Sequence, residues 1–83
     1  IKISSKFKKK YRRLPKIIKE EAKEKEFLFR KNPFHPQLKT HKLSGKNKET
    51  WAFWITYSYR IKFIFLSPGE VLFLDVGRDY QFQ

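Results

Sequence analysis

Apolar residues near the N-terminus recur with helical spacing. Phe7, Tyr11 and Leu14 would lie on one face of a helix, and most positions between them hold Lys or Arg. The pair Ser4-Ser5 precedes this stretch, and serine is one of the residues that cap helix N-termini. The pattern therefore predicts an amphipathic helix that begins after this pair and ends at the next proline.

A second helix is predicted after Pro15, because proline interrupts one helix and suits the first turn of another. Glu21 and Lys25 have the spacing of an ion pair on its outer face. Two prolines within residues 32–36 end it. The two helices together predict an antiparallel hairpin. The positions expected to face inward on the second helix are Ile17, Ile18, Ala22, Leu28 and Phe29.

Strand-like alternation replaces the helical spacing from residue 49 onward. It predicts two strands joined by a reversal at Tyr57-Ser58. Residues 67–69 predict the next turn, residues 71–76 a last strand and residues 1–3 a short edge strand. Residues 37–43 are expected to form a loop and residues 44–48 a turn. The side chains expected on the buried face are Trp51, Phe53 and Ile55, then Ile61, Phe63 and Phe65.

These elements define the expected fold class, which is α+β. In β-α-α-β-β-β order, the helical hairpin packs on one side of a small antiparallel sheet, and residues 1–83 form a single domain. The opposite face of the sheet would be free for a ligand. Arg60 and Lys62 alternate with the buried positions of their strand, so that free face is expected to carry positive charge.

Charge divides the chain unevenly. Residues 1–48 hold 17 Lys and Arg against 4 Glu, and the whole chain has a net charge of +12. Such a surplus predicts nucleic acid as the first partner, an acidic protein as the second and an anionic membrane as the third. The apolar stretches are far shorter than the roughly 20 residues that span a bilayer. The absence of cysteine fits a reducing compartment, so we expect a soluble cytoplasmic protein.

A cationic patch is the predicted functional site. Arg60 and Arg78 supply guanidinium groups, whose paired N–H donors match two phosphate oxygens. If the patch holds RNA, the ribose 2′-hydroxyl can attack the neighbouring phosphorus without a metal, given a base, an acid and nearby cations. His41, Tyr80 and Asp79 are the candidate proton-transfer groups. The lysines expected to hold the RNA backbone are Lys39, Lys42, Lys46 and Lys48.

Each candidate also has a structural interpretation. Arg60 would equally serve as a solvated outward residue of a strand. His41, a lone histidine in a lysine-rich segment, is more typical of a surface loop residue than of a catalyst. Tyr80 would equally be a terminal packing residue. The basic run at residues 8–13 is typical of a solvated helix face or of a surface that docks an acidic partner. No metal-ligand spacing and no glycine-rich phosphate loop is present, so no cofactor is expected.

An ordered set of segments resembles the RelE/ParE superfamily of bacterial and archaeal type II toxins. The segments are residues 35–45 (HPQLKTHKLSG), 51–53 (WAF), 57–61 (YSYRI) and 71–77 (VLFLDVG). The resemblance implies a toxin bound and neutralised by an acidic antitoxin in a hetero-oligomer. It also implies an endoribonuclease that cleaves mRNA on the ribosome. Tyr59-Arg60 matches the Tyr-Arg pair whose arginine contacts the scissile phosphate, and Arg78-Asp79-Tyr80 loosely matches a segment with a basic residue and a tyrosine.

Two other functions remain open. ParE-like relatives share the scaffold and poison DNA gyrase without cutting RNA, and a degenerate toxin would keep only antitoxin binding. A generic basic RNA-binding domain is the third possibility. It predicts neither the Tyr-Arg placement nor the lysine-rich segment before the sheet, and RNA-binding signatures are absent from the sequence.

Overall fold

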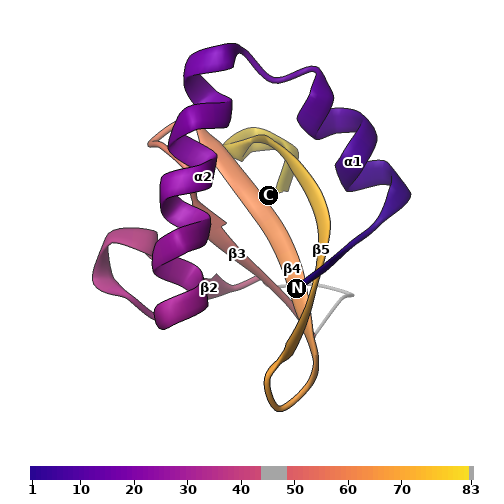
Figure 1. The fold of residues 1–83 in the computed structure, drawn as a ribbon, viewed down its shortest axis with the longest axis vertical. Helices are drawn as coiled ribbons and strands as arrows, with labels where there is room; N and C mark the ends of the chain where they lie inside the picture. The colour runs from indigo at the N-terminus through magenta and orange to yellow at the C-terminus, as the bar shows by residue number, and fades with distance from the viewer. Residues whose placement is uncertain (44–48, 83) are drawn as a thin grey trace.

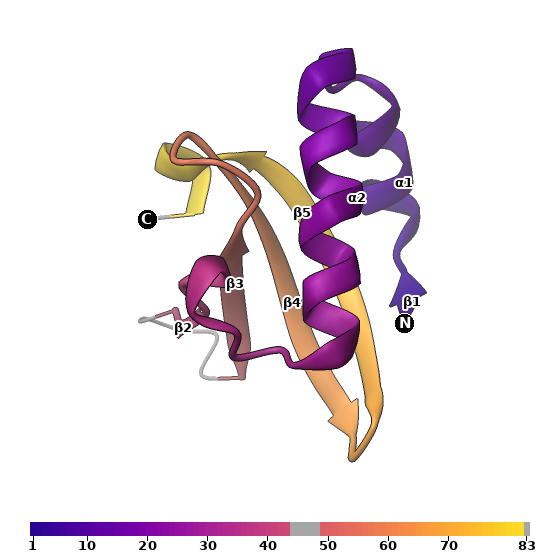
Figure 2. The same ribbon diagram turned by 60° about the vertical axis from the view of Figure 1, so that its left-hand side comes forward.

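Two helices cover one face of a five-stranded sheet (Figures 1 and 2), in a computed structural model that describes residues 1–43 and 49–82. The strand order is β1-β5-β4-β3-β2. This arrangement confirms the α+β prediction. The elements are β1 (Lys2–Ile3), α1 (Ser5–Arg12), α2 (Lys16–Lys31), the 3₁₀ helix η1 (Pro36–Leu38), β2 (His41–Lys42), β3 (Thr50–Trp54), β4 (Tyr59–Ser67), β5 (Glu70–Arg78) and the 3₁₀ helix η2 (Asp79–Phe82).

The sheet differs from the prediction at its two edges. β1 pairs in parallel with β5, so the sheet is mixed rather than purely antiparallel. The expected loop at residues 37–43 instead contains η1 and the short strand β2. In β2, His41 pairs with Ala52 and Lys42 with Trp51. A two-residue strand gives almost no alternation to detect, because its position depends on the strand it joins rather than on its own pattern.

Both helices begin close to their predicted positions. Ser4 caps α1, and its hydroxyl accepts a hydrogen bond from the backbone N–H of Phe7 at 3.0 Å. In α2, Ala22 and Phe29 are buried, whereas Ile17 is 67% exposed. The inward assignment of Ile17 is therefore wrong. Ile17 lies about 100° around the helix from Ile18, and only the Ile18 side packs against the core.

The core centres on Phe29 of α2. Its ring lies 4.9 Å from Phe53 of β3, 5.0 Å from Phe63 of β4 and 5.5 Å from Phe73 of β5, measured between ring centroids. All four side chains are buried. One aromatic residue of the helix therefore contacts the three central strands, which fixes α2 over the middle of the sheet.

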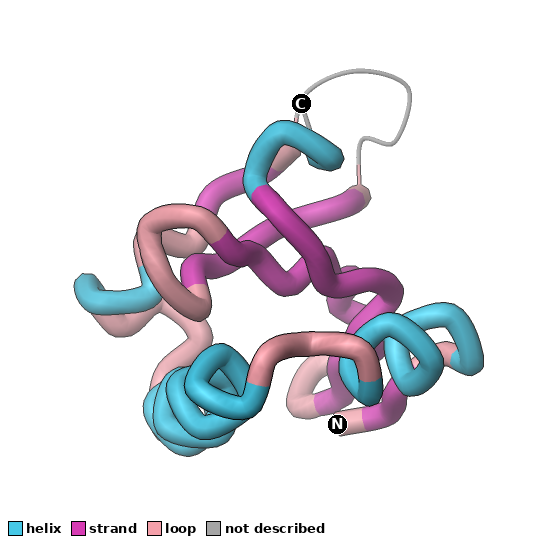
Figure 3. Tube along the Cα trace, turned by 90° about the horizontal axis from the view of Figure 1, so that it is seen from above, coloured by secondary structure: helices cyan, strands magenta, loops and turns pink. Residues whose placement is uncertain are grey.

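The face of the sheet opposite α1 and α2 is available for a site. η2 lies on this side of the sheet (Figure 3). Arg60 pairs across the strands with Trp54 and Gly77, and Lys62 pairs with Ala52 and Asp75. Within the described residues, no helix is both long and apolar enough to cross a membrane.

Candidate functional site

A pocket of about 400 Å³ opens on this face, where β2, β3 and β4 meet η2. It brings together Arg60, His41 and Lys39 of the predicted site. Asp79, one of the predicted proton-transfer groups, also lines it. The strand register explains why Arg60 and His41 line the same pocket. Arg60 pairs with Trp54 of β3, and His41 pairs with Ala52, two residues earlier on the same strand. The lining residues are Lys39, His41, Leu43, Ala52, Trp54, Arg60, Asp79 and Phe82.

Arg60 is buried and held in place by several contacts. Its Nη1 donates hydrogen bonds to the carbonyl oxygens of Thr56, at 2.8 Å, and of Tyr57. Its guanidinium carbon lies 4.2 Å from the centroid of the Trp54 ring. The side chain is only 8% exposed. The β3–β4 turn and one tryptophan therefore fix the orientation of the guanidinium before any ligand arrives.

Part of the Arg60 guanidinium remains open to a ligand. Among the described residues, its Nε and Nη2 donate no hydrogen bond, and no buried side-chain nitrogen or oxygen lacks a partner. These two nitrogens are therefore not fully buried, and Arg60 lines the pocket. An adjacent N–H pair of this kind matches two phosphate oxygens.

Burial lowers the pKa of Arg60, and the charges of Asp79 and Tyr57 partly oppose this shift. An arginine stays protonated in proteins even so. A phosphate would strengthen the opposing effect, because an anion beside the guanidinium favours its charged form. The pocket therefore holds a permanent positive charge that lacks most of its hydration.

His41 has a defined tautomer when neutral. Its Nδ1 lies 2.9 Å from the carbonyl oxygen of Lys39, and a carbonyl only accepts, so Nδ1 carries the hydrogen. Nε2 then holds the lone pair and is free to take a proton. The side chain is exposed and lines the same pocket as Arg60. The arrangement is that of a general base beside a cation.

Lys39 has an unusual backbone. Its φ is +52°, in the left-handed region that costs a non-glycine residue about 1 kcal/mol or more. This conformation ends η1 and turns the chain into β2, which sets His41 opposite Ala52. A lysine at a position that favours glycine places a cation at the pocket wall.

η2 closes the pocket because the chain folds back after β5. The Asp79 N–H donates to the Ser58 carbonyl at 2.9 Å, and the Arg78 N–H donates to Gln81 Oε1 at 2.8 Å. A Cβ at Gly77 would clash with the Gln81 amide. The Gln81 amide ends a flexible side chain that can move, so the hydrogen bond from the Asp79 N–H to Ser58 is the contact that holds Asp79 at the pocket lined by Arg60.

Three other predicted site residues lie outside this pocket. Arg78 pairs with Tyr59 and stacks on its ring at 5.0 Å, on the helix side of the sheet. Tyr80 is 65% exposed and does not line the pocket. Lys42 pairs with Trp51 and lies 6.0 Å over its ring, on the sheet face opposite His41. Lys46 and Lys48 lie outside the described residues.

Trp54 is the site residue whose role the sequence reasoning missed. It supports the Arg60 guanidinium with its ring and lines the pocket. The sequence does contain a signal for the contact between Trp54 and Arg60. Once the reversal is placed at residues 57–58, antiparallel pairing sets residue 54 opposite residue 60. Within the described part of the chain, no cluster of three or more His, Asp or Glu side chains is arranged to hold a metal ion.

Comparisons with known proteins find similarity in structure only. No family model matches the chain, and no curated protein matches its sequence. The solved RelB–RelE antitoxin–toxin complex from Methanococcus jannaschii contains a similar chain, with 17% identity, a TM-score of 0.75 and coverage of 98% of this chain and 93% of that one. The YoeB/ParE toxin from Agrobacterium tumefaciens has 17% identity, a TM-score of 0.78 and coverage of 96% and 100%.

A third similar structure is a copper-bound mutant toxin from Helicobacter pylori. The sequence identity is 20% and the TM-score is 0.71, and the match covers 99% of this chain and 96% of the Helicobacter pylori chain. The agreement spans the whole fold, including the two helices and the mixed sheet. The chain therefore has a RelE/ParE-like toxin fold.

Proposed function

We propose that this protein is the toxin of a type II toxin–antitoxin system, acting in the cytoplasm as an endoribonuclease on ribosome-bound mRNA. The observation that carries the proposal is the pocket that is lined by both Arg60 and His41, where the Nδ1 of His41 bonds to the Lys39 carbonyl and leaves Nε2 free. The fold of the similar toxins supports the same conclusion.

The proposed reaction needs no metal ion. The 2′-oxygen forms a bond to phosphorus and the bond from phosphorus to the 5′-oxygen breaks, which leaves a 2′,3′-cyclic phosphate and a 5′-hydroxyl. His41 Nε2 takes the 2′ proton. Arg60 and Lys39 stabilise the charge that grows on the phosphate oxygens. The 5′-oxygen must gain a proton as it leaves, and Tyr80 and Asp79 stay the candidate proton-transfer groups for this step. Arg78 stays a predicted second guanidinium.

The test is translation of a defined mRNA in vitro, followed by mapping of new RNA ends. We expect cleaved message with 2′,3′-cyclic phosphate on the upstream piece and 5′-hydroxyl on the downstream piece. His41→Asn should lower cleavage at least about a hundredfold, because a general base typically contributes that much or more. Arg78→Ala and Tyr80→Phe in the same assay test their predicted roles.

The chain offers a matched control. His35 is the other histidine, and its Nδ1 accepts from the Gln37 N–H at 3.1 Å as the cap of η1. His35→Asn keeps a capping side chain and should cleave within a few-fold of wild type. Intact message at doses that stop translation would eliminate the nuclease. Full cleavage by His41→Asn would remove the histidine from the mechanism.

A non-cleaving toxin is the second candidate. The positions of Arg78 and Tyr80 favour it, since neither lines the pocket, which then lacks the second guanidinium and the tyrosine of the predicted site. Inhibition of DNA supercoiling by gyrase, with no new RNA ends, would establish a ParE-like function. Antitoxin binding without either effect would establish a degenerate toxin.

The proposed partner is an acidic antitoxin in a hetero-oligomer. The net charge of +12 supports it, as do the exposed basic side chains of α1. Those side chains include Lys8, Lys9 and Arg12. Co-expression with the neighbouring reading frame should yield a stable complex and relieve growth arrest. A neighbour that neither binds nor protects would contradict the pairing.

A further inference from the structure

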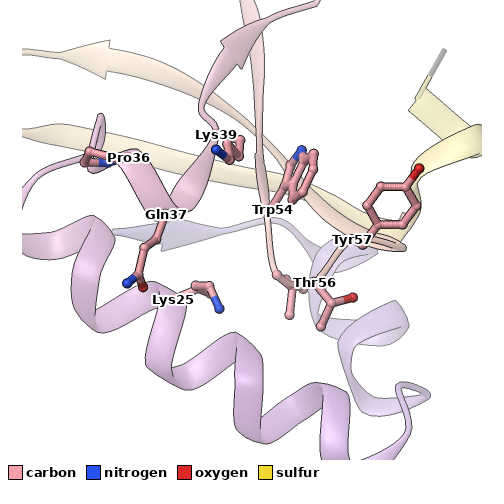
Figure 4. A pocket seen from close by; sticks show the side chains of 8 residues that line it. Lys25, Pro36, Gln37, Lys39, Trp54, Thr56 and Tyr57 are labelled. Carbon is pink, nitrogen blue, oxygen red and sulfur yellow. The ribbon is translucent and has the colours of Figure 1, made fainter.

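A second pocket adjoins the candidate site and shares part of its wall. It has a volume of about 490 Å³, within the roughly 300–1,000 Å³ typical of ligand sites. Lys39 and Trp54 line both pockets. Figure 4 shows Lys25 of α2 and Gln37 of η1 on one side, with Trp54 and Tyr57 on the other. A ligand held by Arg60 would therefore extend past Trp54 into this space.

Exposed aromatic surface forms one wall of the second pocket. The rings of Trp54 and Tyr57 lie 5.6 Å apart at 88°, and Tyr57 is 76% exposed. Such an exposed tyrosine contributes little to the core. Nucleobases stack on aromatic side chains of this kind in proteins that bind single-stranded nucleic acid.

The opposite wall offers hydrogen bonds rather than net charge. The Gln37 side-chain amide is exposed and makes no hydrogen bond with the described residues, so both its donor and its acceptor are available. Lys25 is paired with Glu21 at 3.4 Å, which offsets its charge. A second phosphate would gain little here, whereas a base would find stacking and an amide that pairs with its edge.

The open edge of β3 adds backbone groups to this wall. β2 pairs with β3 only at Trp51 and Ala52, so within the described residues no strand covers β3 beyond that point. Trp54 of this uncovered stretch lines the second pocket. Carbonyl and N–H groups at a sheet edge are available to bind a partner.

We propose that the second pocket is a base-binding subsite for single-stranded RNA, holding the nucleobase next to the phosphate bound by Arg60. Tyr57 and Trp54 supply the stacking surface and Gln37 reads the edge of the base. Lys39 bridges the two pockets and contacts the connecting backbone. This inference rests on the proposed function, since it takes the first pocket as the phosphate site.

The test is binding of an RNA that the protein cannot cut. The probes are a 2′-O-methyl hexanucleotide and a matched hexanucleotide with abasic positions, titrated against the Trp51→Phe protein so that Trp54 is the single tryptophan. Base stacking should quench the Trp54 emission. Tyr57→Ala should weaken binding of the base-bearing probe about tenfold and leave the abasic probe unchanged.

Conservative and remote variants separate stacking from folding. Tyr57→Phe keeps the ring and should bind like the parent protein, while Gln37→Ala should change the order of preference among hexanucleotides of different bases. Phe27 is half exposed on α2 and lines neither pocket, so Phe27→Ala should leave both probes unaffected. Circular dichroism spectra of all variants check that the fold persists.

The outcomes distinguish this inference from the nuclease proposal. Three results would overturn the subsite. Tyr57→Ala would bind as tightly as its parent, or it would lose affinity equally for both probes, or the base-bearing probe would not bind at all. The last result would leave an acidic peptide as the occupant to test. Loss confined to the base-bearing probe supports the subsite even if no message is cut, and intact cleavage specificity in Gln37→Ala counts against base reading.

Discussion

Asp75 is a nearly buried carboxylate that joins α1 to β5. Its oxygens lie 2.9 Å from Lys10 Nζ and 3.3 Å from Lys6 Nζ, and one accepts from the Val76 N–H at 2.8 Å. Burial by itself would raise the pKa of Asp75, but the hydrogen bonds from Lys10 and Lys6 outweigh it and hold the pKa below its usual value. The folded state therefore favours the charged carboxylate.

Asp75→Asn should lower the free energy of unfolding by about 1 kcal/mol at pH 7, because the ionic hydrogen bonds become neutral and the lysines are partly exposed. The pKa is lower in the folded chain than the ordinary 3.8. The stabilisation is thus complete above that value and is lost as pH falls through the folded pKa. Urea unfolding at pH 7 and pH 3 measures both effects.

The control for this change is Glu26→Gln. Glu26 pairs with Arg30 at 2.9 Å, but both side chains are well exposed. An exposed pair contributes little, so the expected loss is below about 0.5 kcal/mol. A gap between wild type and Asp75→Asn that stays the same at pH 3 would contradict the ionic explanation.

At the scale of elements, α1 depends on Ser4 for its place beside the sheet. The Ser4 hydroxyl accepts from the Phe7 N–H and donates to the Leu74 carbonyl at 2.8 Å. The Ser4 N–H donates to the Phe73 carbonyl at 2.9 Å. One residue thus ends the pairing of β1 with β5 and starts the helix.

Ser4→Ala should reduce the free energy of unfolding by about 1–2 kcal/mol, since it removes a helix cap and leaves the Leu74 carbonyl without this donor. Thermal or urea unfolding measures the change. Ser5→Ala is the matched control, because Ser5 is an exposed helical residue and alanine favours helix. Equal stabilities for the two variants would show that the cap contributes nothing.

Arg60 also stabilises an element of the fold, because it holds the β3–β4 turn in addition to lining the pocket. Removing its side chain would leave the Thr56 and Tyr57 carbonyls without their donor. Loss of toxicity in Arg60→Ala would therefore combine lost phosphate binding with a loosened turn. Arg60→Lys, with unfolding measured beside activity, separates the two effects.

For the whole molecule, the net charge of +12 governs RNA binding at a distance, while contacts in the pocket govern its salt dependence. The affinity of an uncleavable RNA should fall steeply between about 50 and 200 mM salt. Lys39→Gln should reduce the slope of log affinity against log salt by about 0.7, the value for one lost contact to a single strand. Filter binding across this salt range measures it.

Lys23→Gln is the control for the salt experiment. Lys23 is an exposed lysine of α2 and lines neither pocket of the candidate site. Lys23→Gln removes one positive charge, as Lys39→Gln does, but it removes no contact in the pocket. The slope of log affinity against log salt should therefore stay near that of wild type. Equal changes for both variants would mean that total charge, and not the pocket, determines RNA binding.

The sequence by itself determined the two helices, the three long strands and the reversal at Tyr57-Ser58. Each depends on contacts between residues close in the chain, such as the Ser4 cap, or on an alternation long enough to detect. It also placed Arg60 on the face opposite the core, because side chains alternate along a strand.

Only the tertiary structure decided which candidates share a pocket. His41 lines the same pocket as Arg60 because β2 joins the edge of β3, and Asp79 lines it because the chain folds back after β5 and bonds to Ser58. Arg78 is one residue from Gly77 and lies on the other face. These placements depend on register and edge pairing between distant segments, and a shift of one residue would send each side chain to the opposite face.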